Sequence, residues 1–144
     1  MSSLLIRGGT ILTMNDRWEV VEGDVSIRDG RIAAIGPSLP GGHDRVVEAR
    51  GGYVLPGLIQ THIHLCQTLF RGYADDLALM DWLRTRVWPM EAAHTPASLR
   101  AAARLAATEL LCSGTTSVLT METVHDTDVV FEAVAESGLR ATIG

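Results

Sequence analysis

The order of periodic segments in the second half of the chain constrains the fold most strongly. Residues 53–65 form an apolar run typical of a buried strand, residues 95–112 carry a helical pattern, and residues 115–121 are β-branched and apolar. A shorter helical pattern over residues 128–136 and a strand pattern over residues 139–143 follow. This βαβαβ alternation predicts an α/β protein with a parallel sheet and right-handed crossovers.

Capping residues mark the expected ends of the two helices. Thr95 is expected to cap the longer helix, because a Thr hydroxyl can accept an unpaired backbone N–H of the first turn. Pro96 suits the first helical position, because it has no N–H that would lack a partner there. Gly114 and Gly138 should end the two helices, since glycine readily adopts the left-handed turn found there. The apolar flank of the longer helix is expected to comprise Leu99, Ala103, Ala106, Leu110 and Leu111.

The first fifty residues show a different pattern, of short strands joined by tight turns. Asp29-Gly30 stands between alternating apolar positions and predicts a type I′ hairpin, because glycine tolerates the positive φ of that turn. We expect a small antiparallel sheet with strands at residues 4–6, 10–14, 24–27, 31–35 and 45–49. Residues 66–94 lack a clear period and are expected to be irregular.

The alternation also predicts that the fold needs more chain. The 144 residues would by length alone suit one domain. Three parallel strands with two helices, however, would leave a sheet edge and a sheet face uncovered. We therefore expect the front part of a longer polypeptide, or a chain completed by another.

Composition excludes several classes of function. Twelve Lys and Arg against 17 Asp and Glu give a net charge of -5, and no basic run could follow a phosphate backbone. Nucleic acid is therefore not an expected partner, and neither is a membrane, because no apolar run reaches the roughly 18 to 20 residues of a span.

Cys66 and Cys112 lie far apart, which favours a reducing cytoplasm and two small core side chains. The N-terminal residues have no basic region of a secretory signal.

His62 and His64 are the first candidates for chemistry. They stand at i and i+2 in a predicted strand, so both side chains should point to one face and Ile63 to the other. Two imidazoles on one face can chelate one Zn²⁺ at about 2.0 to 2.1 Å. The pair lies at the carboxyl end of a strand, where parallel barrels build their active sites, which weighs against two exposed surface histidines. Two ligands do not close a site, so further ligands are needed.

A family resemblance rests on these histidines and the residues around them. Residues 55–64, Leu-Pro-Gly-Leu-Ile-Gln-Thr-His-Ile-His, resemble the Pro-Gly-hydrophobic-hydrophobic-x-x-His-x-His signature of the amidohydrolase superfamily. Residues 71–77, Arg-Gly-Tyr-Ala-Asp-Asp-Leu, and residues 88–91, Trp-Pro-Met-Glu, are similar to its deaminases and chlorohydrolases of aminopurines, their nucleosides and triazines. The resemblance covers essentially the whole chain and is greatest to S-adenosylhomocysteine and 5′-methylthioadenosine deaminases.

The resemblance implies a fold and a domain organisation. The superfamily combines a (β/α)8 TIM barrel with a flanking β-sandwich. Residues 1–54 would then be part of the β-sandwich domain, and residues 55–144 would be the start of the barrel. The barrel would be incomplete in this chain.

The resemblance also implies a reaction and a cofactor. The complete protein would deaminate an aminopurine nucleoside or a related aminated heterocycle by hydrolysis, with one divalent metal, Zn²⁺ or Fe²⁺. His62 and His64 would be metal ligands, and Glu91 would bind the ribose hydroxyls, since an ionised carboxylate can accept both protons of a diol. The remaining ligands and the acid and base would lie beyond residue 144. No catalytic residue is therefore assigned within the chain, which alone is expected to be inactive.

Several other polar and aromatic residues could bind substrate or serve the fold. Trp88 and Trp82 could stack on a purine as pocket walls, or could anchor a loop to the core. Instead of binding ribose, Glu91 could be a solvated acid in a loop. Arg71 with residues 75–76 is expected to be a structural charge cluster that holds the loop. A surface or turn position without a role is the default for the remaining histidines, His43, His94 and His125.

Rival functions remain open. Within the superfamily the alternatives are guanine-type or triazine hydrolysis and, more distantly, cyclic amide hydrolysis at a two-metal site. A non-catalytic metal-binding subunit is the alternative from another class. The expected partner is a small-molecule substrate, and homo-oligomers are common in the resembled family.

Overall fold

The computed structural model describes residues 2–122 and 124–144. The chain folds as two compact units that divide between Pro56 and Gly57. Each unit has its own sheet, and together they make a mixed α/β fold. No helix among the described residues is long and apolar enough to cross a membrane.

The first unit is a mixed sheet of five strands. In chain order the strands are β1 (Ser3–Leu12), β2 (Val20–Arg28), β3 (Arg31–Gly36), β4 (Arg45–Glu48) and β5 (Tyr53–Val54). β1 pairs antiparallel with β2, and β2 with β3, but β1 runs parallel to β4 and β5. The prediction of an antiparallel sheet is therefore wrong for β4. That strand follows a long connection and not a tight hairpin, so the local sequence does not fix its direction.

The hairpin between β2 and β3 has the predicted turn. Asp29 and Gly30 have φ values of 50° and 74°, and they separate the paired residues Arg28 and Arg31. Positive φ at both central residues is the requirement of a type I′ turn. The prediction from the Asp-Gly dipeptide is confirmed.

β1 is one long strand where the sequence predicted two short ones. A shift of register between Ile6 and Gly9 lets the strand continue past the glycines. Asp24 of β2 is buried beside this shift and accepts the backbone N–H groups of Leu39 and Gly8, both at 2.9 Å. These two bonds hold the pKa of the Asp24 carboxyl below its usual value.

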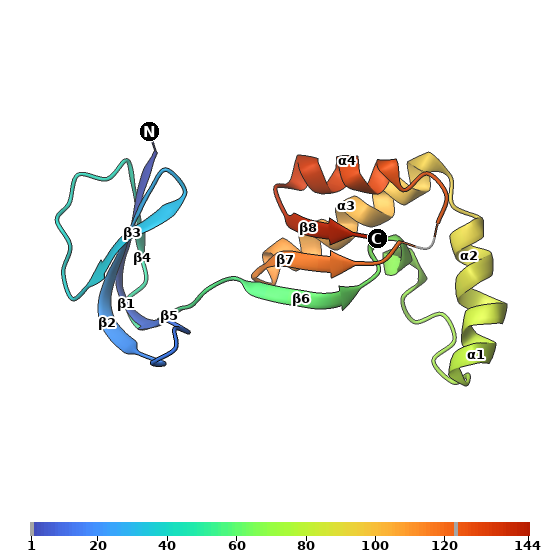
Figure 1. Ribbon diagram of the computed structural model, residues 1–144, viewed down its shortest axis with the longest axis horizontal. Helices are drawn as coiled ribbons and strands as arrows, with labels where there is room; N and C mark the ends of the chain where they lie inside the picture. The colour runs from blue at the N-terminus through green and yellow to red at the C-terminus, as the bar shows by residue number, and fades with distance from the viewer. Residues whose placement is uncertain (1, 123) are drawn as a thin grey trace. The chain divides into compact units, whose positions relative to one another are not determined.

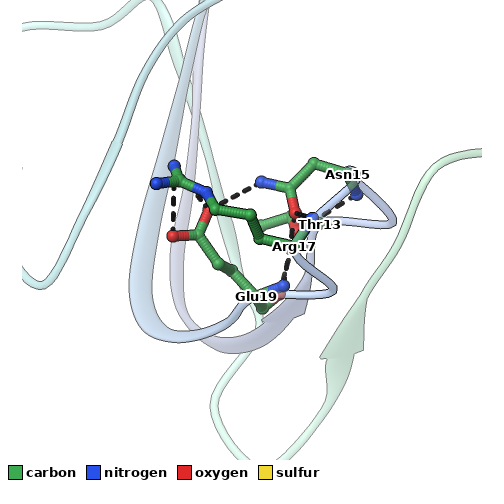
Figure 2. A network of polar contacts seen from close by, with 4 residues as sticks. All are labelled: Thr13, Asn15, Arg17 and Glu19. Atoms are coloured by element: carbon green, nitrogen blue, oxygen red, sulfur yellow. Dashed lines mark hydrogen bonds and ion pairs between the residues drawn. The ribbon is translucent and has the colours of Figure 1, made fainter.

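A network of polar side chains shapes the loop between β1 and β2 (Figure 2). The Thr13 hydroxyl donates to the backbone carbonyl of Glu19 at 2.8 Å. The amide of Asn15 and the guanidinium of Arg17 both donate to the Glu19 carboxylate, at 2.6 Å and 3.2 Å. Glu19 therefore joins the two sides of the loop.

The second unit confirms the predicted βαβαβ alternation. Strands β6 (Leu58–Ile63), β7 (Thr115–Thr120) and β8 (Arg140–Ile143) pair parallel in that order. Helices α3 (Pro96–Cys112) and α4 (Asp128–Ser137) make the crossovers and lie on the same face of the sheet (Figure 1). The core between helices and sheet includes Leu99, Ala103, Leu110, Val118, Val130, Val134 and Leu139.

The capping predictions for α3 are confirmed. The Thr95 hydroxyl accepts the Ser98 backbone N–H at 3.2 Å, and the Ser98 hydroxyl accepts the Thr95 N–H at 2.9 Å, which completes a capping box. Gly114 follows the helix with φ of 87°. Two other predictions were wrong. Leu111 was expected on the apolar flank of the helix and Cys112 in the core, but both are exposed at the end of α3.

Residues 66–94, predicted to be irregular, contain a 3₁₀ helix and a continuous longer helix. The 3₁₀ helix is η1 (Leu65–Phe70), and the longer helix comprises α1 (Leu79–Trp82), the π-helical turn η2 (Leu83–Val87) and α2 (Trp88–Ala92). In η2 the Trp88 N–H donates to the carbonyl of Leu83, five residues earlier. This wide turn breaks the 3.6-residue period that reveals a helix. It ends two residues before Pro89, whose ring would crowd an ordinary α-helical turn.

β6 was predicted to be a buried strand, and the structure shows an exposed one. It is the edge strand of its sheet, and Ile59 is 71% exposed. Its last residue, Ile63, packs against the core cluster under α3 and α4. The apolar composition of β6 is therefore not matched by burial within the described part of the chain.

Candidate metal and substrate site

The two candidate metal ligands lie side by side at the carboxyl end of β6. His62 belongs to the strand, and His64 follows it as the residue before η1. Their ring centroids are 5.1 Å apart and the rings are perpendicular. Ile63, between them, packs against the core. The two imidazoles therefore project from the sheet face opposite to the helices, as strand alternation requires.

The tautomer of His64 is fixed by a neighbouring strand. Its Nδ1 lies 2.6 Å from the backbone carbonyl oxygen of Met121, which directly follows β7. A carbonyl only accepts, so Nδ1 carries a proton, and in the neutral ring Nε2 is then the nitrogen with a free lone pair. Metal-binding histidines are commonly held by this kind of bond from their second nitrogen. This bond orients the His64 ring and leaves Nε2 as the nitrogen that could bind a metal.

The donor set fits a divalent metal in part. Two imidazole nitrogens suit Zn²⁺ or Fe²⁺, but a tetrahedral site takes four ligands. Within residues 2–122 and 124–144, no group of three or more His, Cys, Asp or Glu side chains could hold a metal ion. The described residues bring the His62 and His64 pair together, and a four-ligand site would need further ligands.

Glu122 is the site residue that sequence reasoning missed. Its side chain is 7% exposed, and its two carboxylate oxygens accept the backbone N–H groups of Leu65 and Cys66, each at 2.9 Å. The Thr120 hydroxyl also contacts the same carboxylate. The available signal was an acidic residue just after a predicted parallel strand, at the edge where α/β proteins place their functional groups.

Glu91 lies in α2 and is 2% exposed, so its alternative interpretation as a solvated loop acid is wrong. Its Oε1 accepts a hydrogen bond of 2.8 Å from the side-chain amide of Gln67. The Cys66 sulfur lies 3.8 Å from the same oxygen. Gln67 is three residues beyond His64 in η1, and this turn connects the helix that carries Glu91 to the strand that carries the histidines.

A small pocket adjoins this region. It has a volume of about 130 Å³ and is lined by Gln67, Phe70, Arg71, Tyr73, Asp75, Trp82, Arg86 and Met90, among others. Trp82 is thus a pocket wall, whereas Trp88 is 45% exposed and is not among the described residues that line it. The guanidinium of Arg86 lies 5.4 Å from the centroid of the Tyr73 ring, within the range of a cation–π contact.

Arg71 has a structural role, but its partner differs from the one expected. It forms an ion pair of 2.6 Å with Glu109 of α3, and the described residues show no ion pair from Arg71 to Asp75 or Asp76. The bond from Arg71 holds the pKa of the Glu109 carboxyl below its usual value. Arg71 therefore fastens the loop after η1 to a helix, and does not form a cluster within the loop.

Two of the remaining histidines make separate polar contacts, and the third is exposed. His94 bridges two elements, because its Nε2 lies 2.9 Å from the Cys66 carbonyl oxygen and its Nδ1 lies 3.0 Å from the Ser98 hydroxyl. His43 contacts the Ser26 hydroxyl at 2.8 Å in the first unit. His125 is exposed. His94 has a structural contact that its turn-like sequence context did not reveal.

Comparison with known proteins points to one family. The model of the amidohydrolase family matches residues 53–144. Among curated proteins, a 5′-deoxyadenosine deaminase of Methanosarcina mazei is 42% identical over 99% of this chain and 33% of its own length. A 5-methylthioadenosine/S-adenosylhomocysteine deaminase of Natronomonas pharaonis is 42% identical over 100% of this chain and 32% of its own length. The chain spans about a third of the length of the curated relatives it matches.

Solved structures agree with this match. An atrazine chlorohydrolase from Arthrobacter aurescens, in complex with zinc, has a TM-score of 0.89 and 28% identity, over 98% of this chain and 35% of that one. An adenosine deaminase from Xanthomonas campestris with bound zinc has a TM-score of 0.84 and 34% identity, over 97% of this chain and 33% of that one. The family model covers well over half of the chain, and the fold matches over nearly all of it. The chain belongs to the amidohydrolase family.

Proposed function

We propose that this chain is part of a metal-dependent hydrolytic deaminase of adenosine-type nucleosides, such as S-adenosylhomocysteine, 5′-methylthioadenosine or 5′-deoxyadenosine. The observation that carries the proposal is the His62 and His64 pair, with Nδ1 of His64 bound to the Met121 carbonyl. The sequence identity of 42% to two named deaminases of these nucleosides supports the substrate class.

His62 and His64 would hold one divalent metal, Zn²⁺ or Fe²⁺. The zinc in two of the similar solved structures supports this kind of metal without deciding between the two ions. When bound, such an ion lowers the pKa of water toward ~7 and so supplies hydroxide near neutral pH. Hydrolysis then replaces the amino group of the heterocycle by oxygen and releases ammonia. The chain's own contribution is to bind Nδ1 of His64 to the Met121 carbonyl, so that Nε2 is the nitrogen presented to the metal.

Glu91 and Trp88 would contribute to substrate binding. The Glu91 carboxylate has about four lone-pair positions, so its bond from Gln67 leaves capacity to accept both hydroxyl protons of a ribose diol. The exposed indole of Trp88 would stack on the base.

The domain organisation and cellular location complete the proposal. Residues 1–54 would be part of a β-sandwich domain and residues 55–144 the start of a TIM barrel. Supporting this, the two compact units divide between Pro56 and Gly57, and the second unit has the parallel βαβαβ order of a barrel. A cytoplasmic location and homo-oligomers stay predictions.

The substrate class can be tested with Glu91→Gln in the full-length protein. If the carboxylate accepts a ribose diol, kcat/KM for the nucleoside should fall by about 10- to 150-fold, which corresponds to roughly 1.5 to 3 kcal/mol for hydrogen bonds to a charged group. The 2′,3′-dideoxy analogue should be a poor substrate and nearly indifferent to the change. Glu132→Gln, on the exposed face of α4, is the control.

Equal losses on substrates with and without the diol would remove Glu91 from sugar recognition. That result would favour triazine or guanine-type hydrolysis, and the similarity to the atrazine chlorohydrolase structure makes triazines the next substrates to assay. Release of chloride in place of ammonia would identify that reaction. Metal binding without turnover of nucleosides, triazines, guanine or cyclic amides would indicate a non-catalytic metal-binding protein.

A further inference from the structure

The segment that ends β7 holds the residues around His64 from both sides. Before the histidine, the Met121 N–H donates to the carbonyl of Ile63 at 3.1 Å, and the Thr120 hydroxyl lies 3.0 Å from the same oxygen. At the histidine itself, the ring Nδ1 donates to the Met121 carbonyl. The backbone that enters His64 and the ring of His64 are therefore both fixed by residues 120–121.

Glu122 holds the backbone that leaves His64. Leu65 and Cys66 are the first two residues of η1, and the first N–H groups of a helix have no partner within it. The Glu122 carboxylate accepts both of them, one with each oxygen. Both N–H groups belong to buried residues, so losing these acceptors would leave two unsatisfied donors away from water.

Glu122 and Met121 are adjacent in the chain. One short segment therefore accepts a hydrogen bond from the ring of His64 and two more from the backbone N–H groups of the turn after it. A rotation of that turn would change the direction of the His64 Cα–Cβ bond and stretch the 2.6 Å contact to Met121. Bonds that orient the ligand histidines of metal sites typically change metal affinity by about 10- to 100-fold when they are lost.

We propose that Glu122 is a positioning residue for the metal site: its carboxylate clamps the N–H groups of Leu65 and Cys66 and thereby fixes the direction in which His64 presents Nε2. The inference rests on the proposed function in that it takes His64 as a metal ligand. It assigns no chemical step to Glu122, which acts through the turn that follows His64.

The test compares Glu122→Gln and Glu122→Asp with the parent in the full-length protein. A Gln amide keeps the size of the side chain but turns one acceptor into a donor, which would face an N–H group. Asp keeps both acceptors but is one methylene shorter. The affinity of the metal-free protein for Zn²⁺ and Co²⁺ is measured by competition with a chromophoric chelator. Glu132→Gln, an exposed change on α4, is the control and should bind as the parent does.

We expect affinity to fall by about 10- to 100-fold in Glu122→Gln and less in Glu122→Asp. The absorption spectrum of the Co²⁺ protein should also change, because it reports ligand geometry. In the metal-free protein, amide hydrogens of residues 65–66 should exchange faster than in the parent. A Gln variant that loses thermal stability but keeps the parent's metal affinity and Co²⁺ spectrum would overturn the inference. If the Gln variant does not fold, the Asp variant decides, and unchanged metal affinity in it would also overturn the inference.

The same data separate this inference from the proposed function. A parent protein that deaminates nucleosides, with unchanged metal affinity in both Glu122 variants, would refute only the positioning role. A parent protein that binds metal but does not deaminate, with weakened affinity in Glu122→Gln, would refute only the proposed substrate class.

Discussion

Adding one methyl group at Gly57 should destabilise the second unit, because the start of β6 packs directly on β7. A Cβ atom built on Gly57 would lie 2.2 Å from both Cγ2 and Oγ1 of Thr116. Non-bonded carbon atoms prefer about 3.5 to 4.0 Å, so the strands would have to separate by roughly 1 Å or more. That movement would also stretch the 2.9 Å bond from the Leu58 N–H to the Gly114 carbonyl.

The expected cost follows from these two effects. Overpacking of this kind costs about 1 to 3 kcal/mol, and a strained backbone hydrogen bond adds about 0.5 to 1.5 kcal/mol. The free energy of unfolding of Gly57→Ala should therefore fall by about 1.5 to 4.5 kcal/mol, which lowers Tm by roughly 3 to 18 °C in a domain of about 150 to 250 residues. Differential scanning calorimetry of the full-length protein measures the shift.

Thr116→Ala supplies the matched control. Thr116 is exposed, so this change alone should alter stability by no more than about 0.5 kcal/mol. Combined with Gly57→Ala it removes the two closest atoms and leaves the Thr116 Cβ at 2.8 Å. The double variant should recover more than half of the lost stability. A stable Gly57→Ala variant, or a double variant that recovers nothing, would show that the contact with Thr116 is not the cause.

Three further predictions concern the metal site and the two units. His62→Ala or His64→Ala should lower the metal content measured by mass spectrometry and abolish turnover, whereas full activity at normal metal content would disprove the ligand assignment. Asp24→Asn should destabilise the protein above the usual carboxyl pKa of 3.8. The pKa of Asp24 is lowered in the folded protein, so the stabilising effect of its carboxylate is lost as the pH falls through this folded pKa. The free energies of unfolding of parent and variant, measured with urea, should therefore converge in acid and differ at neutral pH. Thr95→Ala should cost about 0.5 to 2 kcal/mol in thermal unfolding by removing the cap of α3, and Thr95→Ser should cost less; equal losses would contradict the capping role.

Features determined by neighbouring residues could be predicted from the sequence. The Asp29-Gly30 turn depends on two residues that tolerate positive φ. The limits of α3 depend on the Thr95 cap and on Gly114. The alternation of side chains in β6 placed His62 and His64 on one face because strand periodicity is strictly local.

Features determined by distant contacts could not be predicted. The direction of β4 depends on its pairing with β1, which lies about forty residues away in the chain. Glu122 reaches N–H groups 56 and 57 positions earlier, and no local pattern encodes that contact. Glu91 looked like a loop acid because the helix around it has no regular period, and its burial depends on the approach of η1.

The π-helical turn η2 makes the length of the helix before α3 adjustable at one place. A π turn holds one residue more than an α turn. A residue could therefore be lost within Leu83–Val87 while α1 and α2 kept their orientation about the helix axis. A residue lost elsewhere between Leu79 and Ala92 would rotate α2 by about 100° and turn Glu91 away from Gln67. The shortened turn would, however, return Pro89 to an ordinary helical environment, where its ring clashes. Homologues with one residue fewer in this helix should therefore also lack the proline.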